Sequence, residues 1–358
     1  MSRKDKDRRK RRRCVRERRR VRADSMPEEL ARLQEQARKQ AQSHLEKVFS
    51  RLCRYDPVDL LATIGALQLV PENAERAVRL QAYAHVVTCS RVEGNRPAIS
   101  YDELRHLFDD DPIGAMFGYL EDPVEHLFTH EVTFVGGGHI VFPGINASAP
   151  FVLSNLCKAL FFHPAGFPDA RFAAWAQGFI KFMLAVSDRI ARQAGLSRGI
   201  EPRSKPSTPV LVPDRDGLRR LKQSVRFVAT DLSARLRRLD LPASTLNQVC
   251  ARMGDAKLDP QMIAQSPLAC RPMVRIADQV ICAVPGAIVS TITRETLRLG
   301  LEAGLGKDLC RTYSDAVWNT VLESLALLGH APVPAPRLPA LGLPEGREGL
   351  FTLDSDKL

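Results

Sequence analysis

Apolar residues recur at helical spacing near the start of the chain. From residue 30 to residue 52, apolar side chains return every three or four positions, and charged side chains occupy the other face. Ser25 is followed two residues later by Pro27 and three residues later by Glu28, which is a typical capping box with proline in the first turn. The pattern predicts one amphipathic helix from Ser25 to about Cys53.

Three further start signals predict shorter helices. Asp56 directly precedes a proline, and Ser100 is followed three residues later by a glutamate, so both are predicted to begin helices. Asn73 is predicted to cap another helix, which continues toward Val92. The first third of the chain is therefore predicted to be mostly helical.

Two short stretches change from helical spacing to a strand pattern. Apolar residues on both sides of the glycines 136–138 predict a hairpin near residues 130–142. The same order recurs later, with a turn at Ala277 and Asp278, and predicts a second hairpin near residues 272–284. A Pro-Gly pair and a helix follow each hairpin, which indicates an internal duplication of one unit.

These elements predict an α+β fold that is predominantly helical, with two lobes that each contain a short β-hairpin followed by helices. With 358 residues and 44% apolar residues, the chain exceeds one typical domain and can bury a substantial core. The predicted divisions are a disordered basic tail over 1–24, lobes over 25–200 and 214–330, a proline-rich linker over 201–213, and an irregular C-terminal segment over 331–358.

The positive charge of the chain is concentrated in the tail. The first 22 residues hold fourteen Lys and Arg and three acidic residues, so their local charge of +11 equals the formal net charge of the whole chain. Such a run cannot bury enough apolar area to offset its ordering entropy, which predicts disorder in the absence of a partner. The candidate phosphate-binding residues are Arg8, Arg9, Lys10, Arg11, Arg12, Arg13, Arg16, Arg18, Arg19, Arg20 and Arg22.

A polyanion is the partner that this tail fits. Lysine and arginine that neutralise phosphates release counterions, which gives sequence-independent, salt-sensitive binding. The tail has no aromatic residue on which bases could stack, so we expect phosphate contacts rather than base contacts. The sequence thus favours a non-catalytic binding or scaffold protein that contacts nucleic acid non-specifically. Alternatively, the protein is a protein-interaction module, and the tail is an incidental, solubilising extension.

A second basic stretch lies between residues 214 and 241. Intervening aspartates and the lack of a known spacing motif favour an ordinary charged helical face. Its basic residues are Arg219, Arg220, Lys222, Arg226, Arg235, Arg237 and Arg238.

The end of the chain suggests another class of function. A predicted helix from Trp318 to Gly329 carries Glu323 and precedes a predicted strand with Asp354; this arrangement resembles the front of a restriction-endonuclease-like core. In that family the two acids join an acidic-x-Lys motif on the next strand to hold Mg²⁺, which activates water against a phosphodiester. That strand is missing here. The resemblance therefore implies an accessory or truncated N-terminal portion of a Mg-dependent nuclease, and the abrupt apolar end indicates a longer protein.

Other candidate sites have weaker patterns. His126, His130 and His139 lie near one another, but their spacing is not that of a zinc protease and a strand is predicted there, so no metal, cofactor or catalytic residue is predicted. Acidic residues at 109–111, with neighbours at 121, 122 and 125, form a cluster that could meet the basic tail.

The cysteines and the hydropathy of the chain bear on its location. The eight cysteines are scattered without a Cys-x-x-Cys motif, which predicts small buried apolar residues in a reducing compartment. No apolar run reaches the roughly 18 residues that a membrane helix needs, so a cytoplasmic or otherwise intracellular protein is expected.

Overall fold

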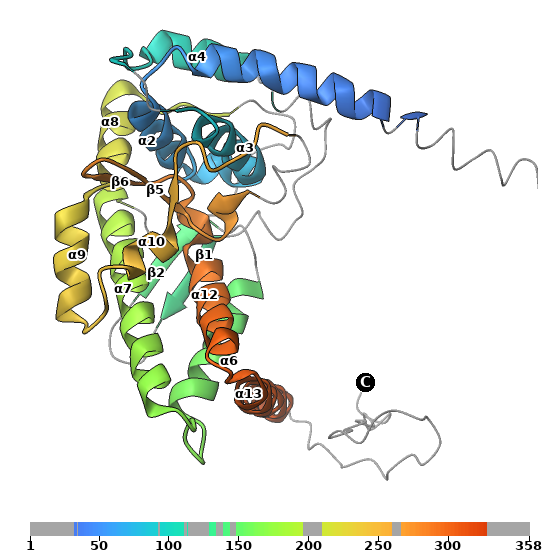
Figure 1. The fold of residues 1–358 in the computed structure, drawn as a ribbon, viewed down its shortest axis with the longest axis vertical. Coiled ribbons are helices and arrows are strands. Elements are labelled where there is room, and N and C mark those ends of the chain that lie inside the picture. Colours follow the sequence, from blue (N-terminus) through green and yellow to red (C-terminus); the bar gives the residue numbers. More distant parts are fainter. Residues whose placement is uncertain are drawn as a thin grey trace, which may run out of the picture.

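The computed structural model describes residues 32–33, 35–91, 94–110, 113, 129–133, 139–143, 148–195, 210–259 and 266–327. Their elements form an elongated, curved body, with the helix over 35–52 across one end and α13 (Gly306–Leu327) at the other (Figure 1). The predicted tail over 1–24 and the predicted segment over 331–358 lie outside the described residues. The described part is α+β and mostly helical, as predicted.

The predicted helix starts at residues 56 and 100 are confirmed. Asp56 accepts a hydrogen bond from the backbone N–H of Val58 at 3.2 Å, and Ser100 and Glu103 form a complete capping box. The elements of this region are the helix over 35–52, α2 (Pro57–Leu67), the 3-10 helix η1 (Pro71–Arg76), α3 (Ala77–Thr88) and α4 (Tyr101–Asp109).

The prediction that Asn73 caps a helix is wrong. Asn73 is fully buried inside η1, and α3 begins at Ala77 without a side-chain cap. The Asn73 amide donates to the carbonyl oxygens of Leu67 at 3.0 Å and Leu211 at 2.9 Å, and it accepts from Leu211 N at 2.7 Å. Its polar atoms therefore fix a segment far away in sequence rather than the first turn of α3.

Both predicted hairpins are present, but the second is part of a larger sheet. Strands β1 and β2 pair antiparallel as a two-stranded sheet, whereas β5 and β6 are the centre of a four-stranded sheet in the order β3-β6-β5-β4. β3 pairs antiparallel with β6, and β4 pairs parallel with β5. The strands are β1 (Thr129–Thr133), β2 (His139–Pro143), β3 (Arg226–Val228), β4 (Cys250–Arg252), β5 (Met273–Ile276) and β6 (Gln279–Cys282).

The longest helix of the middle region, α7, buries an apolar stripe. Phe179, Met183 and Val186 on α7 are fully buried, and Trp175 stacks on Phe179 with ring centroids 5.2 Å apart. The remaining elements are α6 (Ser148–Phe161), α7 (Ala170–Ala194), α8 (Arg215–Ser224), α9 (Ala229–Arg238), α10 (Thr245–Val249), η3 (Pro267–Ala269), η4 (Pro285–Ala287) and α12 (Ile288–Glu302).

One hydrophobic core contains residues from both predicted lobes. Leu61 of α2 and Ile281 of β6 belong to the same buried cluster, so the two-lobe layout is not confirmed. A methyl group at Gly65 would lie closer than 3.0 Å to the carbonyl oxygen of Cys282, which shows how near the backbone of α2 runs to β6. Gln68, just after α2, donates to the carbonyl oxygen of Ala283 at 2.7 Å. Helix α2 and the sheet are therefore one packed unit.

Candidate nucleic-acid interface

The predicted phosphate-binding residues of the tail lie outside the described residues, and their role stays a prediction. The second basic stretch is described in full. It forms α8, β3 and α9 rather than helices alone. Between Arg215 and Arg238 it holds eight Lys and Arg and two acidic residues.

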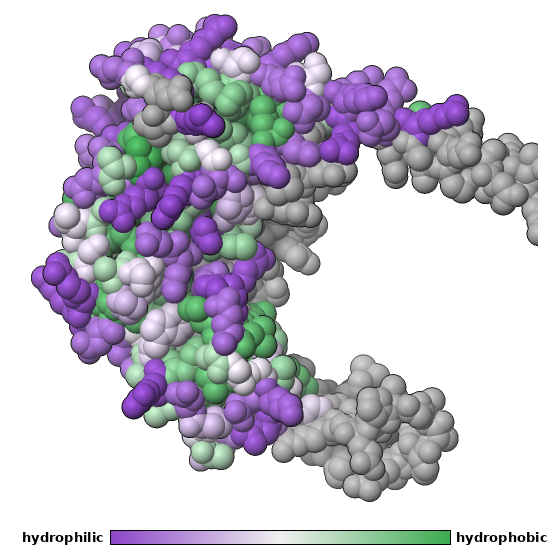
Figure 2. Space-filling view, viewed as in Figure 1, coloured by the Kyte–Doolittle hydropathy of each residue, from purple (hydrophilic) through white to green (hydrophobic). Residues whose placement is uncertain are grey.

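The apolar residues of α8 and α9 determine which side chains face outward. Leu218 on α8 and Leu232 and Leu236 on α9 are buried. Asp214 caps α8 by accepting from the N–H of Gly217 at 2.6 Å. Hydrophilic side chains accordingly cover α9 at the left edge of the molecule (Figure 2). We define the basic surface as the exposed residues Arg215, Arg219, Arg220, Arg235, Arg237 and Arg238.

Most of this surface charge is available to an anionic partner. Arg219 pairs with Asp216 at 2.9 Å and Arg215 with Asp102 at 3.6 Å, and all four side chains are more than 70% exposed. Exposed ion pairs of this kind contribute roughly 0–1 kcal/mol, so a phosphate can replace the carboxylate. Four other arginines form no ion pair within the described part of the chain: Arg220, Arg235, Arg237 and Arg238.

A pocket of about 350 Å³ adjoins the basic surface between α2, the start of α4, and α8. Ile99, Leu104 and Leu218 give it apolar walls, and Tyr101 adds an aromatic ring. Its charged lining residues are Asp59, Arg215, Arg219, Lys222 and Arg226. The pocket thus combines apolar area with one carboxylate and four cations.

Asp59 is the buried centre of this charge cluster. Its side chain is 10% exposed, and its Oδ1 accepts from Lys222 Nζ at 2.5 Å and from Arg226 Nη2 at 3.1 Å. A single carboxylate oxygen therefore joins α2 to α8 and β3. Since one negative charge faces two positive charges, Asp59, Lys222 and Arg226 together have a net charge of +1.

Two polar atoms of this cluster have no hydrogen-bond partner among the described residues. Asp59 Oδ2, an acceptor, and Arg226 Nε, a donor, are both buried and unsatisfied. An unpaired buried polar group costs about 1–3 kcal/mol, more when it is charged, so such atoms are rare in native proteins. The pocket can therefore satisfy a ligand that offers one donor and one acceptor.

Tyr101 is held in place at the same pocket. Its hydroxyl donates to the carbonyl oxygen of Pro213 at 3.0 Å, and the Arg215 guanidinium lies 5.3 Å from the ring centroid. The ring and the guanidinium together provide flat surfaces of the kind on which nucleic-acid bases stack.

Three residues of this pocket were not predicted from the sequence: Asp59, Tyr101 and Arg215. A signal for Asp59 was present, because it is the single charged residue of α2, in which all other residues except Thr63 are apolar. A helix that is apolar on all sides is normally buried, and a buried carboxylate needs cationic partners. Lys222 and Arg226 were recognised only as members of a charged helical face.

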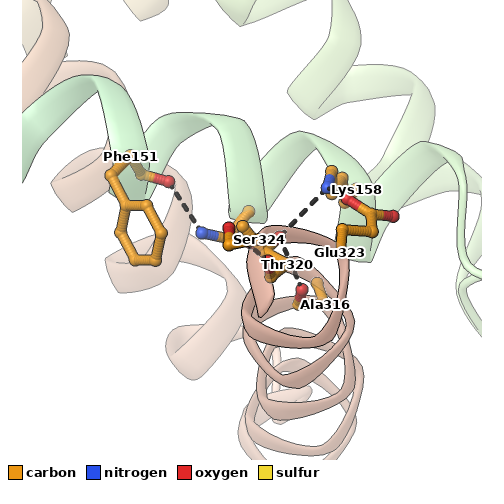
Figure 3. Close-up of polar contacts among 7 residues, drawn as sticks. Phe151, Lys158, Ala316, Thr320, Glu323 and Ser324 are labelled. Carbon is orange, nitrogen blue, oxygen red and sulfur yellow. Dashed lines mark hydrogen bonds and ion pairs between the residues drawn. The ribbon is translucent and has the colours of Figure 1, made fainter. Parts of the chain in front are cut away.

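Glu323, the glutamate on which the resemblance to a nuclease core depends, forms an ion pair with a lysine of another helix. It pairs with Lys158 at 2.8 Å between α13 and α6 (Figure 3). Lys158 also donates to Thr320 Oγ1 at 3.0 Å, and that hydroxyl lies 2.7 Å from Asn155 Oδ1. Asp354 lies outside the described residues, and the nuclease interpretation stays a prediction.

The described part of the chain contains no group of three or more His, Cys, Asp or Glu residues that could hold a metal ion. His126 lies outside the described residues, and His130 and His139 lie on β1 and β2. Asp110, from the predicted acidic cluster, pairs with Arg51 at 3.1 Å, and most of that cluster is also outside the described part.

His85 and Ser266 form a buried polar pair. His85 Nδ1 lies 3.0 Å from Ser266 Oγ, and Nε2 lies 3.1 Å from the carbonyl oxygen of Lys257. Burial lowers the pKa of His85 below its usual value, so the ring is neutral near pH 7 and donates to that carbonyl. Both side chains are buried, and the pair fixes α3 to the segment before η3.

The described cysteines are free thiols of differing exposure. Cys250 and Cys282 are buried in the sheet, as predicted, and burial raises the pKa of Cys250 to about 12. Cys310 is exposed, which differs from the prediction of buried cysteines.

Comparisons of the chain with protein-family models, with curated proteins and with solved structures found no match. None of the helices in the described ranges is both long and apolar enough to cross a bilayer.

Proposed function

We propose that the protein is a non-catalytic, intracellular nucleic-acid-binding protein that contacts phosphates through its basic N-terminal tail and through the basic surface of α8 and α9. The observation that carries the proposal is the set of exposed arginines on that surface, four of which have no ion pair in the described part of the chain. Each phosphate that such a residue neutralises releases counterions and strengthens binding at low salt.

The tail and the basic surface can be tested separately. Binding of labelled duplex DNA, single-stranded DNA and RNA is measured by fluorescence anisotropy across a salt series. The intact chain is compared with a chain that starts at Ser25 and with the triple variant Arg235→Gln, Arg237→Gln, Arg238→Gln. We expect both changes to weaken binding and to flatten the log–log salt slope, on duplex DNA by about 0.9 for each phosphate that the variant no longer neutralises.

A matched control separates a local contact from a change in net charge. The variant Arg171→Gln, Lys307→Gln, Arg311→Gln also removes three exposed cations, but from α7 and α13. It is expected to keep most of the salt slope. If the control loses as much slope as the α9 variant, the basic surface is not an interface. If the intact chain binds none of the nucleic acids at low salt, the proposal is refuted and a protein partner is favoured.

A further inference from the structure

We infer that the pocket around Asp59 binds one unstacked base of a single-stranded nucleic acid, while the neighbouring arginines hold its phosphates. The inference rests on the proposed function and adds base contacts to it. The pocket shares Arg215 and Arg219 with the basic surface but differs from it in the central carboxylate of Asp59, which disfavours a phosphate next to it.

The polar atoms of the pocket match the edge of a base. Asp59 Oδ2 can accept a hydrogen bond and Arg226 Nε can donate one, and neither has a partner within the described chain. Every nucleic-acid base has a ring or amino N–H next to a carbonyl oxygen or a ring nitrogen, so it offers a donor beside an acceptor. A backbone phosphodiester, in contrast, offers acceptors alone and would face the Asp59 charge.

The remaining lining residues suit the rest of a nucleotide. Tyr101, Ile99 and Leu104 provide a ring and apolar walls against which a base can pack. Arg215 and Arg219 are exposed and their carboxylate partners are exposed too, so both can turn to a sugar-phosphate chain. The volume of about 350 Å³ lies within the usual range of small-ligand pockets.

Entry requires one side-chain movement. Asp59 Oδ2 and Arg226 Nε are enclosed, whereas the Lys222 side chain is 20% exposed and that of Arg226 is 37% exposed. Lysine is flexible along its four-carbon chain, so Lys222 can turn outward and still contact a phosphate. The base then gains the two hydrogen bonds that the closed pocket lacks.

The test compares strands that differ only in their bases. A short single-stranded oligonucleotide and an abasic strand with the same number of phosphates are titrated onto the full chain at one salt concentration. The tail contributes phosphate contacts to both strands and has no aromatic residue for stacking. We expect the strand with bases to bind about tenfold more tightly, in the range of one stacked and hydrogen-bonded base.

Two conservative variants then locate the effect. Asp59→Asn removes the buried charge, and Arg226→Lys keeps the charge but removes the Nε donor. Both are expected to reduce the advantage of the strand with bases to about twofold or less. Asp59→Asn should also bind the abasic strand more tightly, because a negative charge has been removed. The control Asp255→Asn raises the net charge equally from an exposed position outside the pocket and should keep the tenfold advantage.

The outcomes separate the two proposals. Equal affinity of the full chain for both strands, or an advantage that survives in Asp59→Asn and Arg226→Lys, overturns the base pocket and leaves phosphate binding intact. Binding of neither strand overturns both proposals. If Asp59→Asn fails to fold, as judged by circular dichroism, the wild-type ratio and the Arg226→Lys ratio decide the question.

Discussion

Replacement of Gly65 by alanine should destabilise the protein, although the same change in most helices is stabilising. Alanine in a helix interior is favoured over glycine by about 0.5–1 kcal/mol. Here the new methyl group would lie closer than 3.0 Å to the carbonyl oxygen of Cys282, a separation that real side chains essentially never show. That carbonyl belongs to β6, which is held on both sides by β3 and β5.

The magnitude follows from two opposing terms. Overpacking of a rigid interior costs about 1–3 kcal/mol, and the higher helix propensity of alanine offsets less than 1 kcal/mol of this cost. We expect a net loss of about 1–2 kcal/mol in the free energy of unfolding. Urea unfolding followed by circular dichroism should show a lower midpoint with an unchanged slope, since the surface exposed on unfolding is the same.

Gly306, the first residue of α13, provides the comparison. A methyl group there would meet the Cδ2 atom of Leu301, the movable end of an exposed side chain rather than a backbone carbonyl. Gly306→Ala should therefore cost clearly less than Gly65→Ala. If Gly65→Ala is as stable as the wild type, the close approach of α2 to β6 is not a rigid contact and the reasoning fails.

Three further predictions concern single residues. Asn73→Ala should lower the free energy of unfolding by about 3 kcal/mol in a urea titration, because it removes three hydrogen bonds of about 1 kcal/mol each from the buried Asn73 amide to the backbones of Leu67 and Leu211; a loss below about 0.5 kcal/mol would contradict this role. Ser100→Ala removes the cap of α4 and should cost about 1 kcal/mol in the same assay, whereas an unchanged midpoint would show that the cap is dispensable. For His85, whose pKa is lowered by burial, the unfolded state takes up a proton first as the pH falls below 6.5, so stability should decrease there. His85→Gln should flatten that part of the stability profile; equal profiles for the wild type and His85→Gln would refute the assignment.

Local signals in the sequence predicted the helices well. The caps at Asp56 and Ser100 depend on side chains that bond backbone groups two or three residues away, so neighbouring residues contain the whole signal. Asn73 is the same type of residue, but its partner Leu211 lies 138 residues later in the sequence. In the sequence alone, an asparagine that caps a helix cannot be distinguished from one that bonds a distant segment.

The sequence did not reveal strands β3 and β4 or the pocket, and the reason is the same for both. β3 and β4 are three residues long, too short for an alternating pattern, and each becomes a strand only through pairing with the β5–β6 hairpin. Asp59 meets Lys222 and Arg226 across separations of 163 and 167 residues. The basic stretch is visible in the sequence, but the carboxylate of Asp59 at its centre is not.

The contact between α2 and the sheet determines when this part of the protein can fold during synthesis. Gln68 bonds the carbonyl oxygen of Ala283, 215 residues later, and Gly65 lies against Cys282. A ribosome releases the chain from its N-terminus, so the apolar faces of α2 have no sheet to cover them until β6 has emerged. Contacts between such distant residues also form slowly because a large loop must first close. Productive folding therefore has to wait until most of the chain has been synthesised, and nascent chains that end before residue 282 are the species that require protection from aggregation.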